Sequence, residues 1–194
     1  MGVKAEYKSA IRSRKLIRQA FLELLQEKEA AKITVTDIVK RADINRGTFY
    51  AHYQDVHAVM EQIENEIIDK MMEFLSALDR GNFYNDPTPL LLQVSQYLSE
   101  NLDYYRVLIN SRESGTFLDK LKDIFVSFMV NDAHLAAETR GTPQFVAQAY
   151  FIAGGVCNLY QAWFHGAISM SLEELARSVG AISANVPLPV SRTS

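Results

Sequence analysis

The stretch that most constrains the fold of this 194-residue chain is Ile33–Tyr53, where the sequence predicts two short helices separated by a tight turn. Thr34 is a favoured N-cap residue, and the Asp37 carboxylate three residues later can bond back to the Thr34 backbone, which completes a capping box. The apolar residues that follow recur at helical spacing, and they are Val35, Ile38, Val39 and Ala42. The period then breaks, so the first helix is expected to be short.

The second helix is predicted to begin after Asn45, another favoured N-cap residue, and to divide its side chains between two faces. Phe49 and Tyr53 lie four residues apart, so they share a face and should pack on the first helix, with Ile44 of the turn also pointing inward. The residues left on the outward face are Arg46, Gly47, Tyr50 and, at its edge, Thr48 and Ala51. Guanidinium and hydroxyl donors at a helix N-terminus, with no bulk at the glycine, suit the major groove of DNA in a helix-turn-helix arrangement.

This stretch resembles the signature of the tetracycline-repressor (TetR) family of bacterial transcriptional regulators. The matching residues, all in one register, are Thr34, Val35, Asp37, Ile38, Ala42, Gly47, Thr48, Phe49, Tyr50, His52 and Tyr53. The match covers about the first quarter of the chain, and the rest agrees in length and helical character only. One position departs from the pattern, because Val56 stands where the family usually has a phosphate-binding lysine, and a lost phosphate contact weakens binding at every DNA sequence alike.

The residues predicted to contact DNA are Thr36, Arg46, Gly47, Thr48, Tyr50 and His52. Arg46 is expected to bind a guanine edge, Tyr50 a base or a phosphate, and Thr48 a phosphate. Thr36 and His52 are expected to be phosphate neighbours.

Charge divides the chain in a way that fits this hypothesis. Residues 1–55 hold 11 Lys and Arg against 7 Asp and Glu, whereas residues 56–194 hold 9 against 16. A basic head on an acidic body would contact DNA through the head alone, although chance unevenness would give the same split. An amphipathic helix is predicted over residues 9–28 after a frayed start, and its cations either approach phosphates or form a solvated face. They are Lys8, Arg12, Arg14, Lys15 and Arg18.

The fold class is all-α, with an N-terminal three-helix DNA-binding head and a larger helical domain. The predicted domains are residues 1–54, which bind DNA, residues 55–185, which bind an effector and dimerise, and a tail at 186–194. The further helices are expected at 55–79, 90–98, 101–110, from 114, 143–165 and 171–184, with a loop at 81–89 and residues 131–140 either irregular or an extension of the preceding helix.

Catalysis, metal binding and cofactors have no supporting pattern. The four histidines, at positions 52, 57, 134 and 165, lie on different segments without ligand spacing, and the chain has no glycine-rich phosphate loop. The single cysteine, Cys157, excludes a disulfide framework and lies on an apolar helix face as a core or pocket thiol. With no signal peptide and no membrane span expected, the sequence indicates a cytoplasmic protein that is not an enzyme.

The larger domain is rich in aromatic residues, which are either core or the lining of a pocket for a small, largely apolar effector. In TetR-like regulators this domain holds the inducer. The predicted pocket residues are Tyr97, Tyr105, Phe125, Phe128, Tyr150, Asn158 and Gln161.

Dimerisation follows from geometry together with the resemblance. One recognition helix contacts only a few base pairs, so two heads about 34 Å apart are needed for useful specificity on a near-palindromic operator. In the family the last two long helices of each subunit form the interface. The predicted interface residues are Phe151, Gly155, Leu159, Trp163, Leu175 and Val179. Gly154-Gly155 could allow close approach either across the interface or within the subunit.

The resemblance therefore implies a homodimeric regulator, most often a repressor, whose spacing of heads on operator DNA is shifted by a small ligand. A second hypothesis is control by a partner protein. The C-terminal half, around Ala153–Val156 and Ser171–Leu175, resembles the TetR branch that includes activators of dihydroxyacetone-kinase operons. The aromatic residues would then be filled core, with an exposed apolar patch elsewhere.

Overall fold

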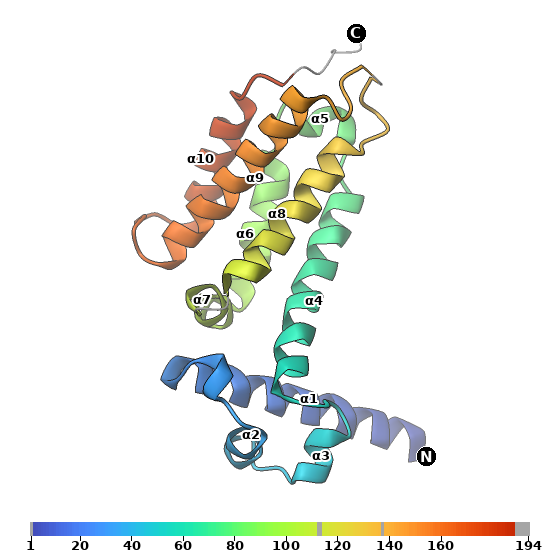
Figure 1. The fold of residues 1–194 in the computed structure, drawn as a ribbon, viewed down its shortest axis with the longest axis vertical. Helices are drawn as coiled ribbons and strands as arrows, with labels where there is room; N and C mark the ends of the chain where they lie inside the picture. The colour runs from blue at the N-terminus through green and yellow to red at the C-terminus, as the bar shows by residue number, and fades with distance from the viewer. Residues whose placement is uncertain (1, 112–113, 137, 189–194) are drawn as a thin grey trace. The chain divides into compact units, whose positions relative to one another are not determined.

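The computed structural model describes residues 2–111, 114–136 and 138–188, and every regular element within them is a helix (Figure 1). The predicted all-α fold is therefore confirmed. The helices are α1 Gly2–Glu27, the 3-10 turn η1 Ala30–Lys32, α2 Val35–Arg41, α3 Arg46–Tyr50, α4 Val56–Ser76, α5 Arg80–Phe83, α6 Thr88–Glu100, α7 Leu102–Asn110, α8 Ser114–Val130, α9 Pro143–Phe164 and α10 Leu172–Ala184. None of the described helices combines the length and the apolarity that crossing a lipid bilayer requires.

The chain forms two compact units. The first comprises Met1–Ile68 with Asn110–Glu113, and the second comprises Asp69–Ile109 with Ser114–Ser194. The division falls inside α4, so this one helix contributes residues to both units. Asp55, the first residue of the second domain that the sequence predicts, directly precedes α4, and its carboxylate accepts a hydrogen bond from the Ala58 backbone N–H at 2.8 Å.

The first unit is built around α1, against which α2 and α3 pack. Ile17, Phe21 and Leu24 of α1 are buried, as are Ile38 of α2 and Phe49 of α3. The amphipathic helix predicted over residues 9–28 is thus confirmed as part of α1. The prediction that residues 1–8 are frayed is wrong from residue 2 onward, because α1 begins at Gly2. Residues 3–9 contain neither glycine nor proline, so nothing in them stops the helix.

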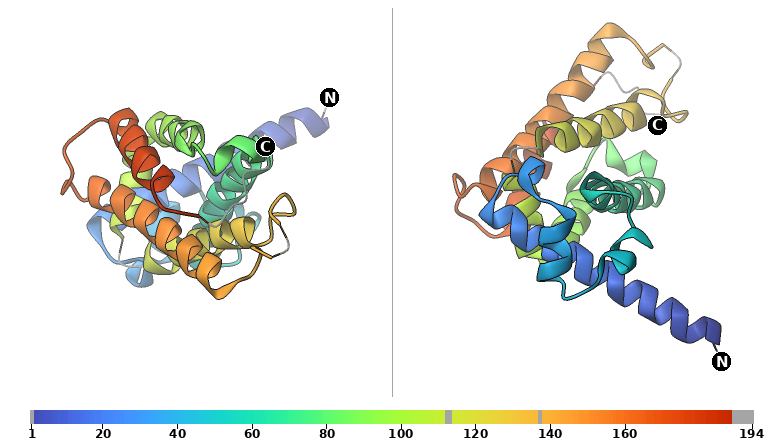
Figure 2. Two further views of the ribbon diagram at one scale, coloured as in Figure 1. Left: turned by 90° about the horizontal axis from the view of Figure 1, so that it is seen from above. Right: turned by 60° about the horizontal axis from the view of Figure 1, so that its bottom comes forward.

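The second unit has two close helix pairs, α8 with α9 and α10 with α6 (Figure 2). Gly180 lets α10 approach α6, since a Cβ atom there would lie 2.3 Å from the Thr88 hydroxyl oxygen and 3.0 Å from the Thr88 Cα. The sequence also predicts the caps of two helices in this unit, because Thr142 precedes Pro143 and Ser171 is followed three residues later by Glu174. Both caps are present: Thr142 caps α9, and Ser171 with Glu174 forms a capping box on α10. Gly166, with φ at +78°, follows the end of α9.

One segment of the second unit differs from the sequence prediction, and another decides between two predicted alternatives. Residues 81–89 were expected to be a loop, but α5 extends to Phe83, whose buried ring lies 6.0 Å from the rings of both Phe125 and Phe128. Burial of that ring fixes a turn of helix that local turn formers alone would not predict. Of the alternatives for residues 131–140, the irregular one is correct over the described positions, because α8 ends at Val130.

Candidate nucleic-acid interface

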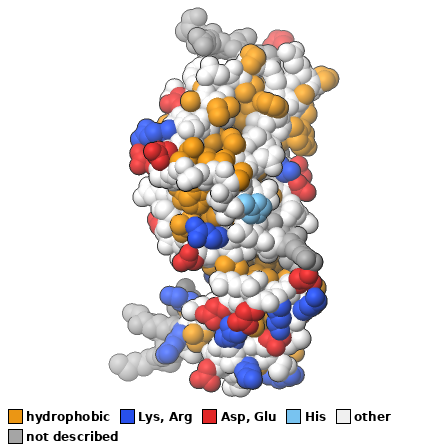
Figure 3. Space-filling model, turned by 90° about the vertical axis from the view of Figure 1, so that its left-hand side faces the viewer, with side chains coloured by type: hydrophobic (Ala, Val, Ile, Leu, Met, Phe, Trp, Pro, Cys, Tyr) orange, Lys and Arg blue, Asp and Glu red, His pale blue; other side chains and the backbone are white. Residues whose placement is uncertain are grey.

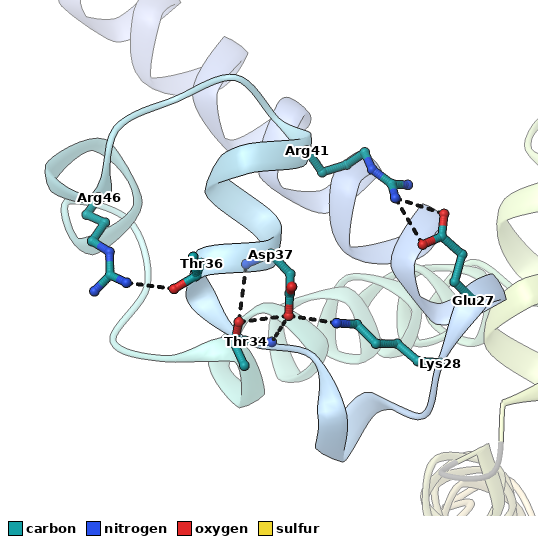
Figure 4. Close-up of polar contacts among 7 residues, drawn as sticks. All are labelled: Glu27, Lys28, Thr34, Thr36, Asp37, Arg41 and Arg46. Carbon is teal, nitrogen blue, oxygen red and sulfur yellow. Dashed lines mark hydrogen bonds and ion pairs between the residues drawn. The ribbon is translucent and has the colours of Figure 1, made fainter.

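The capping box predicted at the start of α2 is present and is reinforced by a residue from outside the pair. The Asp37 carboxylate accepts hydrogen bonds from the Thr34 backbone N–H at 2.8 Å, from the Thr34 hydroxyl at 2.7 Å and from the Lys28 ammonium at 2.7 Å (Figure 4). Bonding by Lys28, and then by Thr34, holds the pKa of Asp37 well below its ordinary value. The start of α2 is therefore fixed to the connector that follows α1.

The turn between α2 and α3 is fixed by backbone geometry and by a second cap. Asp43 adopts a left-handed φ of 51°, and the half-buried Ile44 follows it, with its N–H donating to the Val39 carbonyl at 3.0 Å. The Asn45 side chain then accepts from the Thr48 backbone N–H at 2.7 Å. A Cβ on Gly47 would lie 3.1 Å from this Asn45 oxygen, so the glycine leaves room for the cap as well as for a partner outside the helix.

The two faces of α3 separate as the sequence predicts. Phe49 is fully buried and Tyr53 is 4% exposed, with their ring centroids 5.9 Å apart. Tyr50, whose ring meets the edge of Phe49 at 5.5 Å, is 54% exposed. Two aromatic rings therefore hold the helix while a third is presented to its surroundings.

The predicted DNA-contacting residues lie close together on α2, α3 and the turn that follows α3. Arg46 donates a hydrogen bond across the α2–α3 turn to the Thr36 hydroxyl at 2.6 Å (Figure 4). Thr36, Arg46, Gly47 and Tyr50 are exposed, whereas Thr48 and His52 are half-buried. The outward surface thus carries one guanidinium, two hydroxyl groups and an exposed stretch of backbone.

Several cations of the first unit are neutralised by carboxylates. Arg18, for which the sequence left phosphate contact and a solvated face as alternatives, forms an ion pair with Glu66 at 2.6 Å. Arg41 lies against Glu27 at 2.8 Å and 3.0 Å, and Lys28 against Asp37. Among the α1 cations from residue 9 onward, whose side chains the structure describes, Arg12, Arg14 and Lys15 are exposed. Sequence spacing gave no signal for these pairs, because the partners of Arg18 and Arg41 lie 48 and 14 residues away.

Val56, which stands where the TetR pattern usually has a lysine, is the first residue of α4. Its side chain is half-buried, and the neighbouring His57 is exposed. The start of this helix therefore offers an imidazole, but not the ammonium that the family pattern would place there.

The predicted pocket residues divide into an inner and an outer group. Tyr97, Tyr105, Phe125 and Phe128 belong to aromatic contacts inside the second unit, with the Tyr97 and Tyr105 rings 5.5 Å apart. Tyr150 and Asn158 do not belong to the interior of the second unit as predicted, because both lie on the exposed side of α9. That helix buries positions 145, 149, 152, 153, 160 and 164, so positions 150 and 158 point away from the core. Gln161 is half-buried.

The predicted interface residues divide in the same way. Phe151 is 69% exposed and Gly155 is exposed, whereas Leu159 and Trp163 are half-buried. Leu175 and Val179 are 2% and 1% exposed because they pack in the core of the single chain, and this corrects their placement on a surface. Figure 3, which looks onto the side of the second unit where α10 lies, shows hydrophobic side chains gathered on that face.

Two families match this chain. The family described as "Bacterial regulatory proteins, tetR family" matches residues 17–63, which include α2 and α3. The family described as "Transcriptional regulator C-terminal region" matches residues 85–185, more than half of the chain.

Curated relatives match over part of their length. The chain is 32% identical over 100 residues to the HTH-type dhaKLM operon transcriptional activator DhaS of Lactococcus lactis subsp. lactis (strain IL1403), covering 51% of this chain and 50% of that protein. It is 29% identical over 76 residues to the uncharacterized HTH-type transcriptional regulator YxbF of Bacillus subtilis (strain 168), covering 39% of this chain and 20% of that protein. The chain thus spans half or less of the length of these relatives.

Solved structures share the fold over nearly the whole chain. A TetR transcriptional regulator from Streptococcus agalactiae 2603V has a TM-score of 0.61 at 21% identity, covering 94% of this chain and 99% of that one. The dihydroxyacetone kinase operon activator DhaS has a TM-score of 0.58 at 20% identity, covering 88% and 93%. At these identities the likeness concerns the fold alone.

Proposed function

The chain belongs to the tetR family of bacterial regulatory proteins, a family of DNA-binding transcriptional regulators and not of enzymes, and on that basis we propose that it binds a near-palindromic operator as a homodimer through α3. Repression is the commonest mode in this family, and a regulator of this kind represses or activates according to where its operator lies. Operator binding would take place in the cytoplasm. The observation that carries the proposal is the separation of the two faces of α3.

The outward face of α3 has the chemistry that base and phosphate contacts need. Arg46 pairs with no carboxylate among the described residues and can bind the O6 and N7 acceptors of a guanine, while the exposed Tyr50 offers a hydroxyl to a base or a phosphate. Thr48 and His52 are candidates for phosphate contacts, and Thr36 for one as well. Gly47 lets the backbone of α3 come close to the duplex.

Dimerisation through α9 and α10 is supported by the composition and exposure of α9. Its 22 residues include no charged side chain, although one face of the helix is open to solvent in the single chain. Phe151 is exposed there, and Ile182 of α10 is 58% exposed. An uncharged face with a protruding aromatic ring is typical of an interface between subunits.

The two glycines of α9 point to the same surface. A Cβ on Gly154 or on Gly155 would meet nothing within 4 Å in the single chain, so packing inside the subunit does not require either glycine. Each glycine costs about 1 kcal/mol of helix stability relative to alanine. Of the two alternatives left open by the sequence, close approach across the dimer interface is therefore the one we propose.

Control by a small effector is proposed through α4, the helix that contributes residues to both compact units. A ligand among the aromatic residues Tyr97, Tyr105, Phe125 and Phe128 would shift α4 and with it the separation of the two DNA-binding heads. The dimer would then exchange between two populations, one with its heads about 34 Å apart and able to bind the operator, and one with a different separation that cannot bind it. The ligand concentration would set the ratio of the two.

Control by a partner protein is the second candidate. It is favoured by the burial of Tyr105, which packs as core, and by the exposed apolar residues Tyr150 and Phe151. The relative DhaS is named as a transcriptional activator of an operon, so activation is a second candidate for the outcome of DNA binding.

The proposal is tested by the affinity of the purified protein for a duplex selected from random DNA, at stated salt. We expect Arg46→Ala to weaken binding by roughly 10-fold or more and to relax the preference at one base pair of each half-site. Arg106→Ala is the matched control, because Arg106 is an exposed arginine of α7, outside both proposed interfaces, and the variant should bind as the wild type does. Unchanged affinity and preference for Arg46→Ala would contradict the assignment of α3.

A further inference from the structure

Arg46 is the first residue of α3, and its guanidinium is bonded to a neutral hydroxyl rather than to a carboxylate. The N-terminus of a helix carries partial positive charge, so a guanidinium there gains nothing from the helix dipole. Among the residues that the structure describes, Arg46 has no carboxylate partner, whereas Arg18 and Arg41 are each paired with glutamates. The Arg46 guanidinium instead donates a hydrogen bond from Nη2 to the Thr36 hydroxyl, at 2.6 Å.

Thr36 is well suited to hold a side chain that projects from another helix. It is the second residue of α2 and lies within the Thr34–Asp37 capping box, so its backbone is fixed. Its β-branched side chain has few rotamers, which limits the directions that the hydroxyl can take. Figure 4 shows Thr36 and Arg46 pointing toward one another across the α2–α3 turn.

The chemistry of this bond preserves what a DNA-binding arginine needs. A carboxylate partner would neutralise the guanidinium, as Glu27 does for Arg41. A neutral hydroxyl leaves the charge intact and uses one of the five N–H donors, so a pair of donors is still available for a guanine edge. Restricting a flexible side chain before binding also lowers the entropy that binding would otherwise lose.

We propose that Thr36 is a positioning residue, which holds the Arg46 guanidinium in its DNA-binding orientation and thereby determines base preference through Arg46. This inference rests on the proposed function of α3, and it differs from the expectation that Thr36 acts as a phosphate contact of its own. The two roles separate in experiment, because a positioning residue has no effect once Arg46 is removed, whereas a phosphate contact acts independently of Arg46.

The experiment is a double-mutant cycle on the selected duplex and on its single-base variants. Thr36→Val removes the hydroxyl and keeps the shape, Thr36→Ser keeps the hydroxyl, and each is combined with Arg46→Ala. We expect Thr36→Val to weaken binding to the preferred duplex by roughly 3- to 10-fold and to flatten preference at the base pair that Arg46→Ala also affects. Thr36→Ser should bind as the wild type does, and Thr36→Val should cost nothing further when Arg46 is already alanine.

A measurement without DNA keeps the inference separate from the proposed function. Thr36 is exposed, so Thr36→Val should fold normally, and NMR relaxation of the Arg46 guanidinium in the free protein should show greater mobility in that variant than in the wild type or Thr36→Ser. Unchanged mobility, or a Thr36→Val penalty that persists in the Arg46→Ala background and is equal for every duplex, would overturn the inference alone. If the wild type selected no duplex, the proposed function would fail and the role of Thr36 with it.

Discussion

Tyr53 fills the core of the first unit with its ring and leaves its hydroxyl buried without a hydrogen-bond partner among the described residues. Burial accordingly raises the pKa of this phenol. An unsatisfied buried hydroxyl costs roughly 1–3 kcal/mol, so the ring stabilises the fold while its polar end opposes it.

We therefore expect Tyr53→Phe to raise the free energy of unfolding by about 1 kcal/mol, because the substitution removes the unpaired hydroxyl and keeps the ring. Urea unfolding of the two proteins measures the difference. Tyr50→Phe serves as the control, since the Tyr50 side chain is exposed and its hydroxyl should not affect stability. A loss of stability in Tyr53→Phe would mean that the hydroxyl has a stabilising partner in solution.

At the scale of whole elements, the sequence predicted best those features that depend on neighbours in the chain. The caps at Thr34, Asn45, Thr142 and Ser171 are local hydrogen bonds within three residues, and all four are present. The burial of Phe49 and Tyr53 followed from the same short spacing. The turn of helix at α5 was missed, because it depends on Phe83 packing against α8, some 40 positions further along the chain.

The link between α5 and the segment after α8 shows the same limit for polar residues. The fully buried Asp132 carboxylate accepts hydrogen bonds from Arg80 at 3.1 Å, from Tyr84 at 2.8 Å and from the His134 backbone N–H at 3.0 Å, and its Oδ1 lies 2.9 Å from the His134 ring Nδ1. Arg80 and Tyr84 are 52 and 48 residues from it in sequence, so no spacing rule could predict the network. Arg80 also lies over the Phe128 ring at 4.5 Å.

This network predicts how stability depends on pH. Burial alone would raise the pKa of Asp132, but the hydrogen bonds from His134, Tyr84 and Arg80 outweigh it and lower the pKa to about 2. Because the folded pKa lies below the ordinary value of 3.8, the stabilisation is present above pH 4 and is lost as the pH falls toward 2, by roughly 2 kcal/mol in total.

Urea unfolding of the wild type and of Asp132→Asn as a function of pH measures this contribution. The variant should be less stable at pH 6, and the difference between the two proteins should shrink as the pH falls from about 4 toward 2. A difference that stays constant over that range would show that the charge of Asp132 does not stabilise the fold.

At the scale of the whole molecule, the uncharged face of α9 is the feature that a single chain leaves unexplained. Phe151 is 69% exposed and Gly155 adjoins open space, although both lie on a helix without charged residues. Membership of α10 alone predicts that Leu175 and Val179 lie at the dimer interface, whereas both are buried in the single chain. Helix periodicity gives the width of an apolar face but does not say which side of it a neighbouring helix such as α6 already covers.

Phe151→Glu should convert the proposed dimer to a monomer, because a charge would be buried against the apolar face of the second copy. Sedimentation velocity at micromolar concentration measures the mass. Met72→Glu introduces the same charge at an exposed apolar position of α4, outside the proposed interface, and should remain dimeric. A Phe151→Glu protein that sediments as the wild type does would place the interface elsewhere.

Two copies of this chain are proposed to present α3 to one duplex, and the decisive experiment is selection of bound sequences from random DNA. We predict enrichment of an inverted repeat whose half-sites are centred about one helical turn, 10 base pairs, apart, with affinity that falls as salt rises. Enrichment of single, unrepeated sites, or of no sequence over the starting pool, would contradict it.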